Sequence, residues 1–151
     1  MDKKEMLVSA LEAGTVIDHI PSDKLMDIIE TLNIEDIKSS VTIGYNLESK
    51  KMGRKSIIKI SDKFFTNEEL SQLSVIAPNL TLCIIKNYNV VEKRKINLPD
   101  ELFNIVKCPN PKCVSNNEPM ASHFHVINKE HGILKCHYCE KEHNVENIKL
   151  K

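Results

Sequence analysis

The sequence lacks an excess of charge of either sign. Lys and Arg total 21, and Asp and Glu total 21, so the formal net charge is 0 at pH 7. No long-range field therefore draws the whole chain to nucleic acid or to an acidic membrane. Arginine is scarce, because Arg54 and Arg94 are the only two, and arginine is best suited to bidentate contacts with guanine or phosphate. These absences count against a reader of DNA sequence.

Long hydrophobic runs are also missing. No apolar segment approaches the length of a membrane span. The stretch MDKKEMLVSALEAG mixes charges of both signs and has no small-residue cleavage site, unlike a signal peptide. We therefore expect a cytoplasmic protein. With 151 residues and 41% hydrophobic content, the chain has enough core for one ordinary domain or two small ones.

Hydrophobic periodicity predicts an α+β fold in the first two thirds of the chain. Helical spacing is predicted over 25–32, after a cap offered by Pro21-Ser22-Asp23, and over 67–76, between a capping box at Thr66 and the stop at Pro78. Extended segments are predicted at 6–11, 15–20, 40–47, 54–60, 80–86 and 88–93. This order fits a ferredoxin-like βαββαβ unit, one antiparallel sheet with both helices on one face, although a rearranged strand order is also compatible.

The last third contains two close cysteine pairs, Cys108 with Cys113 and Cys136 with Cys139, separated by 22 residues. Two such knuckles converge on one tetrahedral Zn²⁺. The alternatives are disulfides, which a non-secreted chain disfavours, or plain buried thiols. His137 and His143 lie close enough to compete as ligands, but the four thiols are the preferred set. Four thiolates leave no open position, so we predict one structural zinc ion and no metal-dependent hydrolysis.

The metal should provide most of the folding free energy of this small unit, because about fifty residues bury little core. The segments HFHVINK, GILKC and NVENIKL are predicted as short strands around the knuckles, as in a zinc ribbon. A connector at 93–107 separates the two parts. Between residues 101 and 151, seven Lys face six Glu, a balance that favours docking to protein over nucleic acid.

Several separated motifs resemble one known family. The segments GTVIDHIP, TIGYNL, MGRKSIIKI, APNLTL, NYNVVEK, CPNPKC and CHYCEKE occur in the order and spacing of the regulatory chain of aspartate carbamoyltransferase. The resemblance covers essentially the entire chain. It implies a non-catalytic subunit of pyrimidine biosynthesis, with an allosteric domain at 1–100 and a zinc domain at 101–151.

The resemblance also implies partners and ligands. Family members form homodimers through the allosteric domain and dock onto separate catalytic chains through the zinc domain. Their nucleotide effectors are CTP, UTP and ATP. The matching residues that line the nucleotide site are Ala10, Val16, Asp18, His19, Lys55, Lys59, Ile85, Tyr88, Val90 and Lys93. Two positions depart from familiar members, since Ser9 replaces a glutamate and Cys83 replaces an asparagine.

The residues by themselves allow simpler interpretations of this site. Lys59 interrupts the apolar run of Ile57, Ile58 and Ile60, which suits a triphosphate contact or a lysine that extends off a sheet edge. A histidine near a strand end, as at His19, is commonly a surface or hydrogen-bonded residue. Strand alternation sends Asp18 and His19 to opposite faces unless the strand ends or bulges there. Asp18 and backbone groups near Tyr88 are candidates to contact the exocyclic edge of the base.

Two other classes of function fit the sequence less well. An RNA-binding protein could combine a ferredoxin-like sheet with a zinc ribbon, but aromatics are only 5% of residues and the strands offer little beyond Tyr45 and Tyr88 for base stacking. An enzyme would need a catalytic constellation. The sequence has no phosphate loop, no Ser/His/Asp order and no open metal site, so carbamoyl transfer belongs to another polypeptide.

Overall fold

The computed structural model describes residues 11–151, which divide into two compact units. The first unit combines the described residues of Met1–Thr66 with Asn79–Ile96, and the second combines Asn67–Pro78 with Asn97–Lys151. Ala10, Ser9 and most of the extended segment expected at 6–11 lie outside the described residues. Among residues 11–151, no helix is long and apolar enough to cross a membrane.

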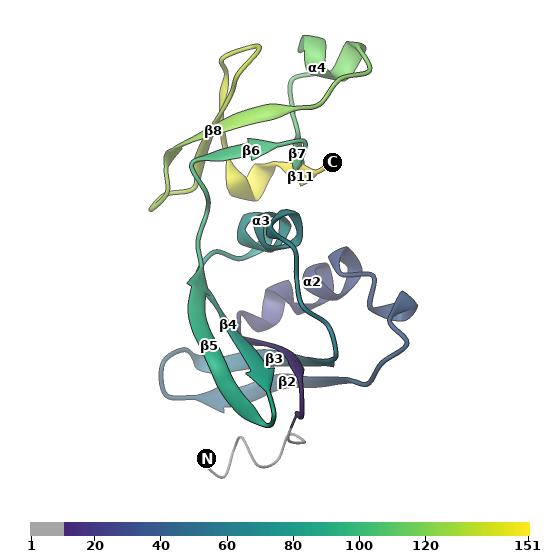
Figure 1. Ribbon diagram of the computed structural model, residues 1–151. Helices are drawn as coiled ribbons and strands as arrows, with labels where there is room; N and C mark the ends of the chain where they lie inside the picture. The colour runs from purple at the N-terminus through teal and green to yellow at the C-terminus, as the bar shows by residue number, and fades with distance from the viewer. Residues whose placement is uncertain (1–10) are drawn as a thin grey trace. The chain divides into compact units, whose positions relative to one another are not determined.

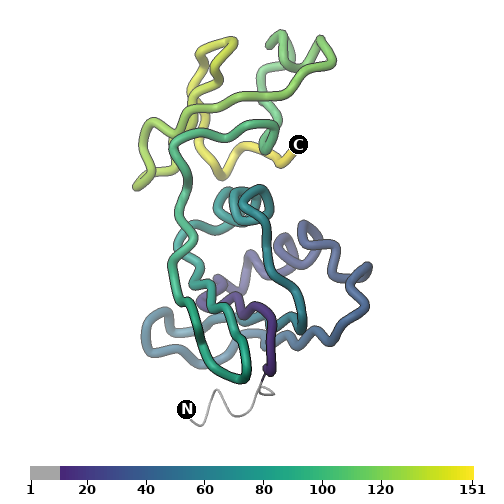
Figure 2. The backbone as a smooth tube through the Cα atoms, in the orientation of Figure 1, coloured from purple at the N-terminus to yellow at the C-terminus, as the bar shows by residue number. Residues whose placement is uncertain are grey.

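The first unit is built on a five-stranded sheet with the order β2-β3-β1-β4-β5 (Figure 1). Every neighbouring pair is antiparallel. The strands are β1 (Gly14–Ile20), β2 (Val41–Ser49), β3 (Gly53–Ser61), β4 (Leu80–Lys86) and β5 (Asn89–Ile96). The first four have the order of a ferredoxin-like sheet, and β5 extends it through the tight β4–β5 hairpin (Figure 2). The predicted α+β class is confirmed.

Short helical segments connect β1 to β2. These are η1 (Ser22–Lys24), α2 (Leu25–Thr31) and η2 (Ile34–Asp36). The expected side-chain cap is wrong, because neither η1 nor α2 has one. The Ser22 hydroxyl is instead 3.0 Å from the Ser56 hydroxyl, so it ties the turn to β3. The helix prediction itself holds, and α2 buries Leu25 and Ile28 almost completely.

The sheet has two different faces because successive side chains alternate. One face carries Ile17, Ile58 and Leu82, each at most 2% exposed. The other carries a smaller apolar cluster of Val16, Ile57 and Ile85. Charged residues surround this second cluster, so it is the face of interest for a polar ligand.

The second unit contains helix α3 and the cysteine-rich segment. Its four-stranded sheet has the order β10-β9-β8-β6, and a two-stranded sheet pairs the C-terminal strand β11 with β7 (Figure 1). The elements are α3 (Asn67–Ile76), β6 (Glu101–Phe103), β7 (Val106–Lys107), α4 (Val114–Asn117), β8 (His123–Asn128), β9 (Ile133–Cys136), β10 (Glu142–Asn144), η3 (Val145–Asn147) and β11 (Lys149–Leu150).

One strand prediction in this unit needs correction. The segment NVENIKL was expected to be extended, but its centre forms η3. Asn144 explains the turn, because its side-chain oxygen accepts a hydrogen bond from the backbone N–H of Glu146 at 2.9 Å. This is the local bonding by which asparagine competes with a strand.

The core of the second unit surrounds the cysteines. Phe124 and Leu134 are fully buried there, together with Val106 of β7. Val75 of α3 belongs to the same cluster. A helix that lies between two strands of the first unit in the sequence therefore completes the core of the second.

Candidate functional site

Two knuckles bring the four predicted thiols together. Cys108 follows β7 and Cys113 precedes α4, while Cys136 ends β9 and Cys139 lies in the next turn. The Sγ atoms all lie within 4.8 Å of one another. The Cys108–Cys139 and Cys113–Cys136 Sγ pairs are each separated by 3.7 Å. A tetrahedral zinc with Zn–S bonds of about 2.3 Å requires S···S separations of roughly 3.8 Å, so the donor set fits zinc.

Hydrogen bonds hold the first knuckle in shape. The Asn116 side-chain amide donates to the carbonyl oxygens of Cys108, at 2.8 Å, and Asn110, at 2.7 Å. The Ser115 hydroxyl lies 3.0 Å from the Cys113 Sγ, where it can donate to a thiolate. Such partners orient the ligands around a metal.

Burial disfavours the thiolate form of these cysteines unless a cation lies nearby. It raises the pKa of Cys108 and of Cys136. Burial also acts to raise the pKa of Cys139, but hydrogen bonds from the Lys141 backbone and the Asn110 side chain outweigh it and lower that pKa to about 7. A divalent cation that favours all four thiolates is the natural counter-charge, which agrees with one structural zinc ion.

Neither histidine considered as a competing ligand joins the four thiols. His137 belongs to a separate group with His123 and His125. The His143 Nε2 atom is buried without a hydrogen-bond partner among the described residues. Burial lowers the pKa of His143, and the charge of Lys141 lowers it further. The His143 ring lies beside Phe124, with ring centroids 6.5 Å apart.

A bulge in β1 brings Asp18 and His19 toward the same polar neighbours. The pairing of β1 with β3 shifts register between Ile17 and Ile20, and His19 has a φ of 57°. The Asp18 carboxylate accepts a 2.6 Å hydrogen bond from the His19 backbone N–H. The His19 Nδ1 atom lies 2.8 Å from the hydroxyl of Thr81, which is the residue paired with Asp18 in β4. The bulge removes the difficulty that strand alternation raised.

Lysines surround this end of the sheet face. Lys55 Nζ is 2.9 Å from the Asp18 carboxylate. Burial is the main cause that lowers the pKa of His19; Asp18 opposes this effect, while the positive charges of Lys55, Lys51 and Lys93 add to it. The lowered pKa favours the neutral imidazole of His19, and an anion bound nearby would favour the protonated ring.

The middle of the face is apolar except for one buried lysine. Val16 pairs with Lys59 on β3 and with Cys83 on β4, and Cys83 pairs with Lys93 on β5. Lys59 is only 8% exposed. Cys83 is only partly buried, and it packs against the cluster of Val16, Ile57 and Ile85.

The remaining predicted residues lie toward the other end of the face. Ile85 pairs with Gly14, whereas Asp18 pairs with Thr81. Four residues of strand separate these points, which is roughly 13 Å along β1. Tyr88 lies in the β4–β5 turn with a φ of 65°, and its backbone N–H donates to the Glu12 carbonyl at 2.9 Å. Asp18 and Tyr88 therefore cannot contact the same base edge, contrary to the expectation from the sequence.

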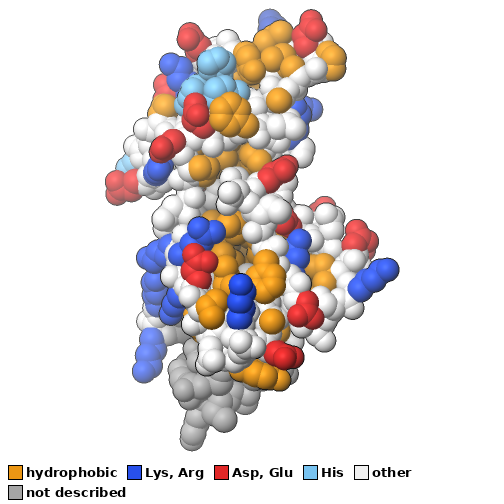
Figure 3. Space-filling view, viewed as in Figure 1, with side chains coloured by type: hydrophobic (Ala, Val, Ile, Leu, Met, Phe, Trp, Pro, Cys, Tyr) orange, Lys and Arg blue, Asp and Glu red, His pale blue; other side chains and the backbone are white. Residues whose placement is uncertain are grey.

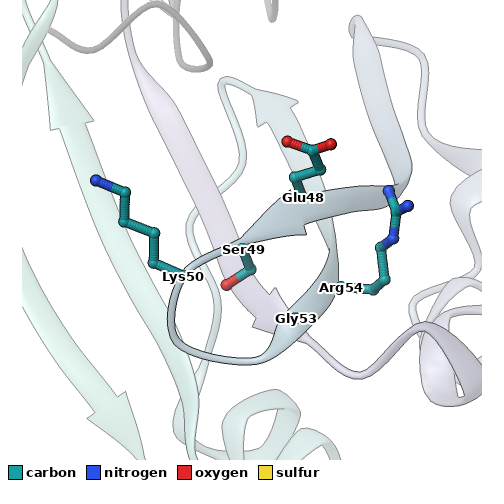
Figure 4. A pocket seen from close by; sticks show the side chains of 5 residues that line it. All are labelled: Glu48, Ser49, Lys50, Gly53 and Arg54. Carbon is teal, nitrogen blue, oxygen red and sulfur yellow. The ribbon is translucent and has the colours of Figure 1, made fainter.

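Two contributors to this face were missed. Thr81, which contacts His19, and Lys51, which acts on its pKa, were not among the predicted residues. Alternation from Cys83 would have placed Thr81 on the face, but no local signal marked Lys51. A hollow at the β2–β3 hairpin contains none of the predicted residues (Figure 4). Its lining is Glu48, Ser49, Lys50, Gly53 and Arg54.

The fold and the metal centre together define a class of protein. It joins an antiparallel α+β unit to a small unit held by a four-thiolate centre that has no open coordination position. Such a metal stabilises structure.

Comparisons with known proteins give the particular family. The model described as "Aspartate carbamoyltransferase regulatory chain, allosteric domain" matches residues 6–97, and the one described as "Aspartate carbamoyltransferase regulatory chain, metal binding domain" matches residues 100–149. The chain belongs to the family of aspartate carbamoyltransferase regulatory chains, and it is a regulatory, non-catalytic polypeptide. The resemblance noted in the sequence is confirmed.

Curated relatives support this over the whole length. The aspartate carbamoyltransferase regulatory chain of Phocaeicola vulgatus is 61% identical over 149 residues, which cover 99% of this chain and 96% of the relative. That of Bacteroides thetaiotaomicron is 56% identical, with 99% and 97% covered. That of Thermococcus sibiricus is 44% identical over 148 residues, with 98% and 97% covered.

Proposed function

We propose that this chain binds nucleotide effectors on the sheet face of its first unit and transmits their effect to the catalytic chains of aspartate carbamoyltransferase, in pyrimidine biosynthesis. Residues 1–100 act as the allosteric domain and residues 101–151 as the zinc domain that docks onto the catalytic chain. The effectors are CTP, UTP and ATP. The observation that carries this proposal is the convergence of Asp18, His19 and Lys55 at one end of the sheet face whose middle contains the buried Lys59.

The layout of the face supports an extended nucleotide. Phosphates bind at the end where His19, Lys55 and Lys93 supply cations and hydrogen-bond donors. The sugar lies over Val16 and Lys59, and the base packs near Ile85 and the β4–β5 turn. Tyr88 and Val90 are exposed there, at 66% and 58%, so a base can reach them.

Pairing of two such chains is part of the proposal. The edge strand β2 exposes Ile43, at 42%, and Tyr45, at 59%. An edge with unpaired backbone and exposed apolar side chains favours association with a second strand. We therefore propose that homodimers form through the allosteric domain.

Effectors act by shifting an equilibrium of the assembled enzyme. CTP and ATP must bind with different affinity to its two states, because a ligand with equal affinity for both shifts nothing. Typical coupling free energies are about 1–3 kcal/mol. One lost contact at the sheet face is therefore enough to remove the response.

Calorimetric titration of CTP and ATP tests the nucleotide site. We expect Lys59→Ala and Lys93→Ala to weaken binding at least tenfold, because Lys93→Ala removes a cation near the phosphates and Lys59→Ala removes the polar contact to the sugar. Lys93 is exposed, so its variant avoids the folding risk of the buried Lys59. Lys38→Ala removes the same charge from an exposed position outside the site and should bind like the wild type. Wild-type affinity in both site variants would contradict the assignment.

Affinity purification of the tagged chain from its native lysate at low salt tests the partner. Mass spectrometry should identify an aspartate carbamoyltransferase catalytic chain, and nuclease treatment should not reduce its recovery. Recovery of nuclease-sensitive RNA without a transferase would favour the RNA-binding alternative.

A further inference from the structure

Three histidines and a glutamate meet on the outer face of the second unit's four-stranded sheet. Leu102 of β6 pairs with Phe124 of β8, and both side chains are buried, with at most 1% of their surface exposed. Their neighbours alternate to the opposite face. There the register pairs Glu101 with His125 and Phe103 with His123.

His137 joins this group through the backbone. Its N–H donates to the His123 carbonyl at 2.9 Å, which continues the pairing of β8 and β9 one residue beyond Cys136. The pattern H-x-H on one strand is thus completed by a third histidine from the neighbouring knuckle. Figure 3 shows histidine side chains gathered as a patch on the surface of this part of the chain.

The ring nitrogens are already close. One donor nitrogen from each of His123, His125 and His137 lies within 4.8 Å of the other two. The Glu101 Oε1 atom is 3.1 Å from His123 Nε2 and 3.3 Å from His125 Nδ1. His125 Nε2 is 3.0 Å from His137 Nδ1. Because Glu101 only accepts, neutral rings satisfy this network with His123 and His125 donating to Glu101 and His137 donating to His125.

Aromatic stacking limits how far the rings can move. The His123 ring lies between Phe103, at 4.2 Å between centroids, and His137, at 4.4 Å. Tyr138 packs edge-on against His137 at 5.2 Å. A donor set that its neighbours hold near the required geometry loses little freedom when it binds a ligand.

We propose that His123, His125, His137 and Glu101 form a second metal site that binds a divalent transition-metal ion, in addition to the zinc of the four cysteines. Imidazole and carboxylate ligands suit Zn²⁺, Ni²⁺ and Cu²⁺, whereas Mg²⁺ and Ca²⁺ prefer all-oxygen sites. Bonds of about 2.0–2.1 Å to nitrogen require N···N separations of roughly 3.4 Å in a tetrahedral site. The ring nitrogens, now within 4.8 Å of one another, close to that spacing when the metal binds.

The site differs from the cysteine centre in what it does for the fold. Its ligands lie on a surface, and His125 is 37% exposed in its side chain. Phe124 and the other core residues are packed without it. Metal bound here is therefore accessible to solvent, and its removal should leave the zinc of the four thiolates in place.

The test uses the full chain carrying one equivalent of zinc at the cysteines. Titration with NiCl₂ in a calorimeter, with bound metal counted by mass spectrometry, should give one nickel per chain without release of zinc. His125→Ala and His137→Ala should each weaken nickel binding at least tenfold. His131→Ala removes an exposed histidine outside the cluster and should match the wild type. MgCl₂ should give no binding heat.

Three outcomes would overturn the proposal. These are absence of nickel binding in the wild type, equal affinity in the cluster variants and His131→Ala, or nickel uptake that only displaces zinc. The last is recognised by thiolate-to-nickel absorption and by a zinc count below one. Circular dichroism and the zinc count verify that each variant is folded before it is scored.

Discussion

The two units of this chain are stabilised in different ways. The first has a continuous five-stranded sheet, with Ile17, Ile58 and Ile60 fully buried on one face. The second has short strands of two to six residues, and cysteines form part of its largest core cluster. A long sheet can fold from its own apolar contacts, whereas a small unit needs a staple. In the second unit, metal coordination therefore takes the place of part of an apolar core.

The sequence order complicates this division. Helix α3 lies between β3 and β4, yet its residue Val75 packs in the core of the second unit. A segment that lies between two strands of the first unit (the sheet unit) therefore forms part of the second unit (the zinc unit). Loss of the metal should disturb α3 as well as the knuckles.

Cys113→Ser should have the largest effect, and it should act on the second unit alone. It removes one thiolate, and structural zinc sites of this kind provide about 10–16 kcal/mol of apparent binding free energy, most of which is folding free energy. We expect the second unit to lose zinc and unfold, while the sheet unit keeps its strands. Zinc counting and NMR of the labelled chain measure both effects.

Cys83→Ala is the matched control for this change. It removes the cysteine outside the cluster, which is packed beside Val16 and Ile85. It should retain one zinc per chain. Full zinc retention by Cys113→Ser would show that the four thiols are not the ligand set.

Ile17→Ala tests the other side of the comparison. Ile17 is 0% exposed in the central strand β1, and truncation of a buried isoleucine costs about 2–5 kcal/mol. We expect chemical denaturation to show a weaker sheet unit with its zinc count unchanged. Met26→Ala, at a position of α2 that is 68% exposed, should cost far less. Zinc loss in Ile17→Ala would mean that the two units unfold together.

Val75→Ala tests whether helix α3 stabilises the second unit. Val75 is 6% exposed within the core of the second unit, and removal of its buried methyl groups should cost about 2 kcal/mol. We expect faster zinc release to a chromogenic chelator. Glu68→Ala, exposed in the first turn of α3, should release zinc at the wild-type rate. Equal zinc-release rates in the two variants would show that the packing of α3 does not stabilise the zinc unit.

The sequence predicted what depends on local pattern and spacing. The strand LTLCIIK has the predicted bounds, and the four cysteines meet as their spacing required. The membership of α3 in the second unit was not predicted, because an amphipathic helix shows which of its faces is apolar but not which core receives it.

Context also decided the details of the candidate sites. The bulge at His19 was allowed by the sequence but needed the observed register to be located. The histidine patch remained hidden, because His123 and His137 are brought together only by the pairing of β8 with β9. Tertiary register, which the local sequence does not state, produced both.

The smallest expected effect is a pH dependence at His19. Its pKa is lowered below the ordinary value of about 6.5, so the unfolded state takes up protons first as pH falls. The stability that this group contributes is thus present above pH 6.5 and is lost at lower pH.

A bound triphosphate reverses the preference, because the anion favours the imidazolium. CTP affinity should therefore rise from pH 8 to pH 6 relative to His19→Gln, by less than about tenfold, the equivalent of one pKa unit. Protonation of the phosphate itself affects both proteins equally, so the ratio isolates His19. A ratio that stays constant in calorimetry across this range would separate His19 from the phosphates and leave the lysines as their only partners in the proposed site.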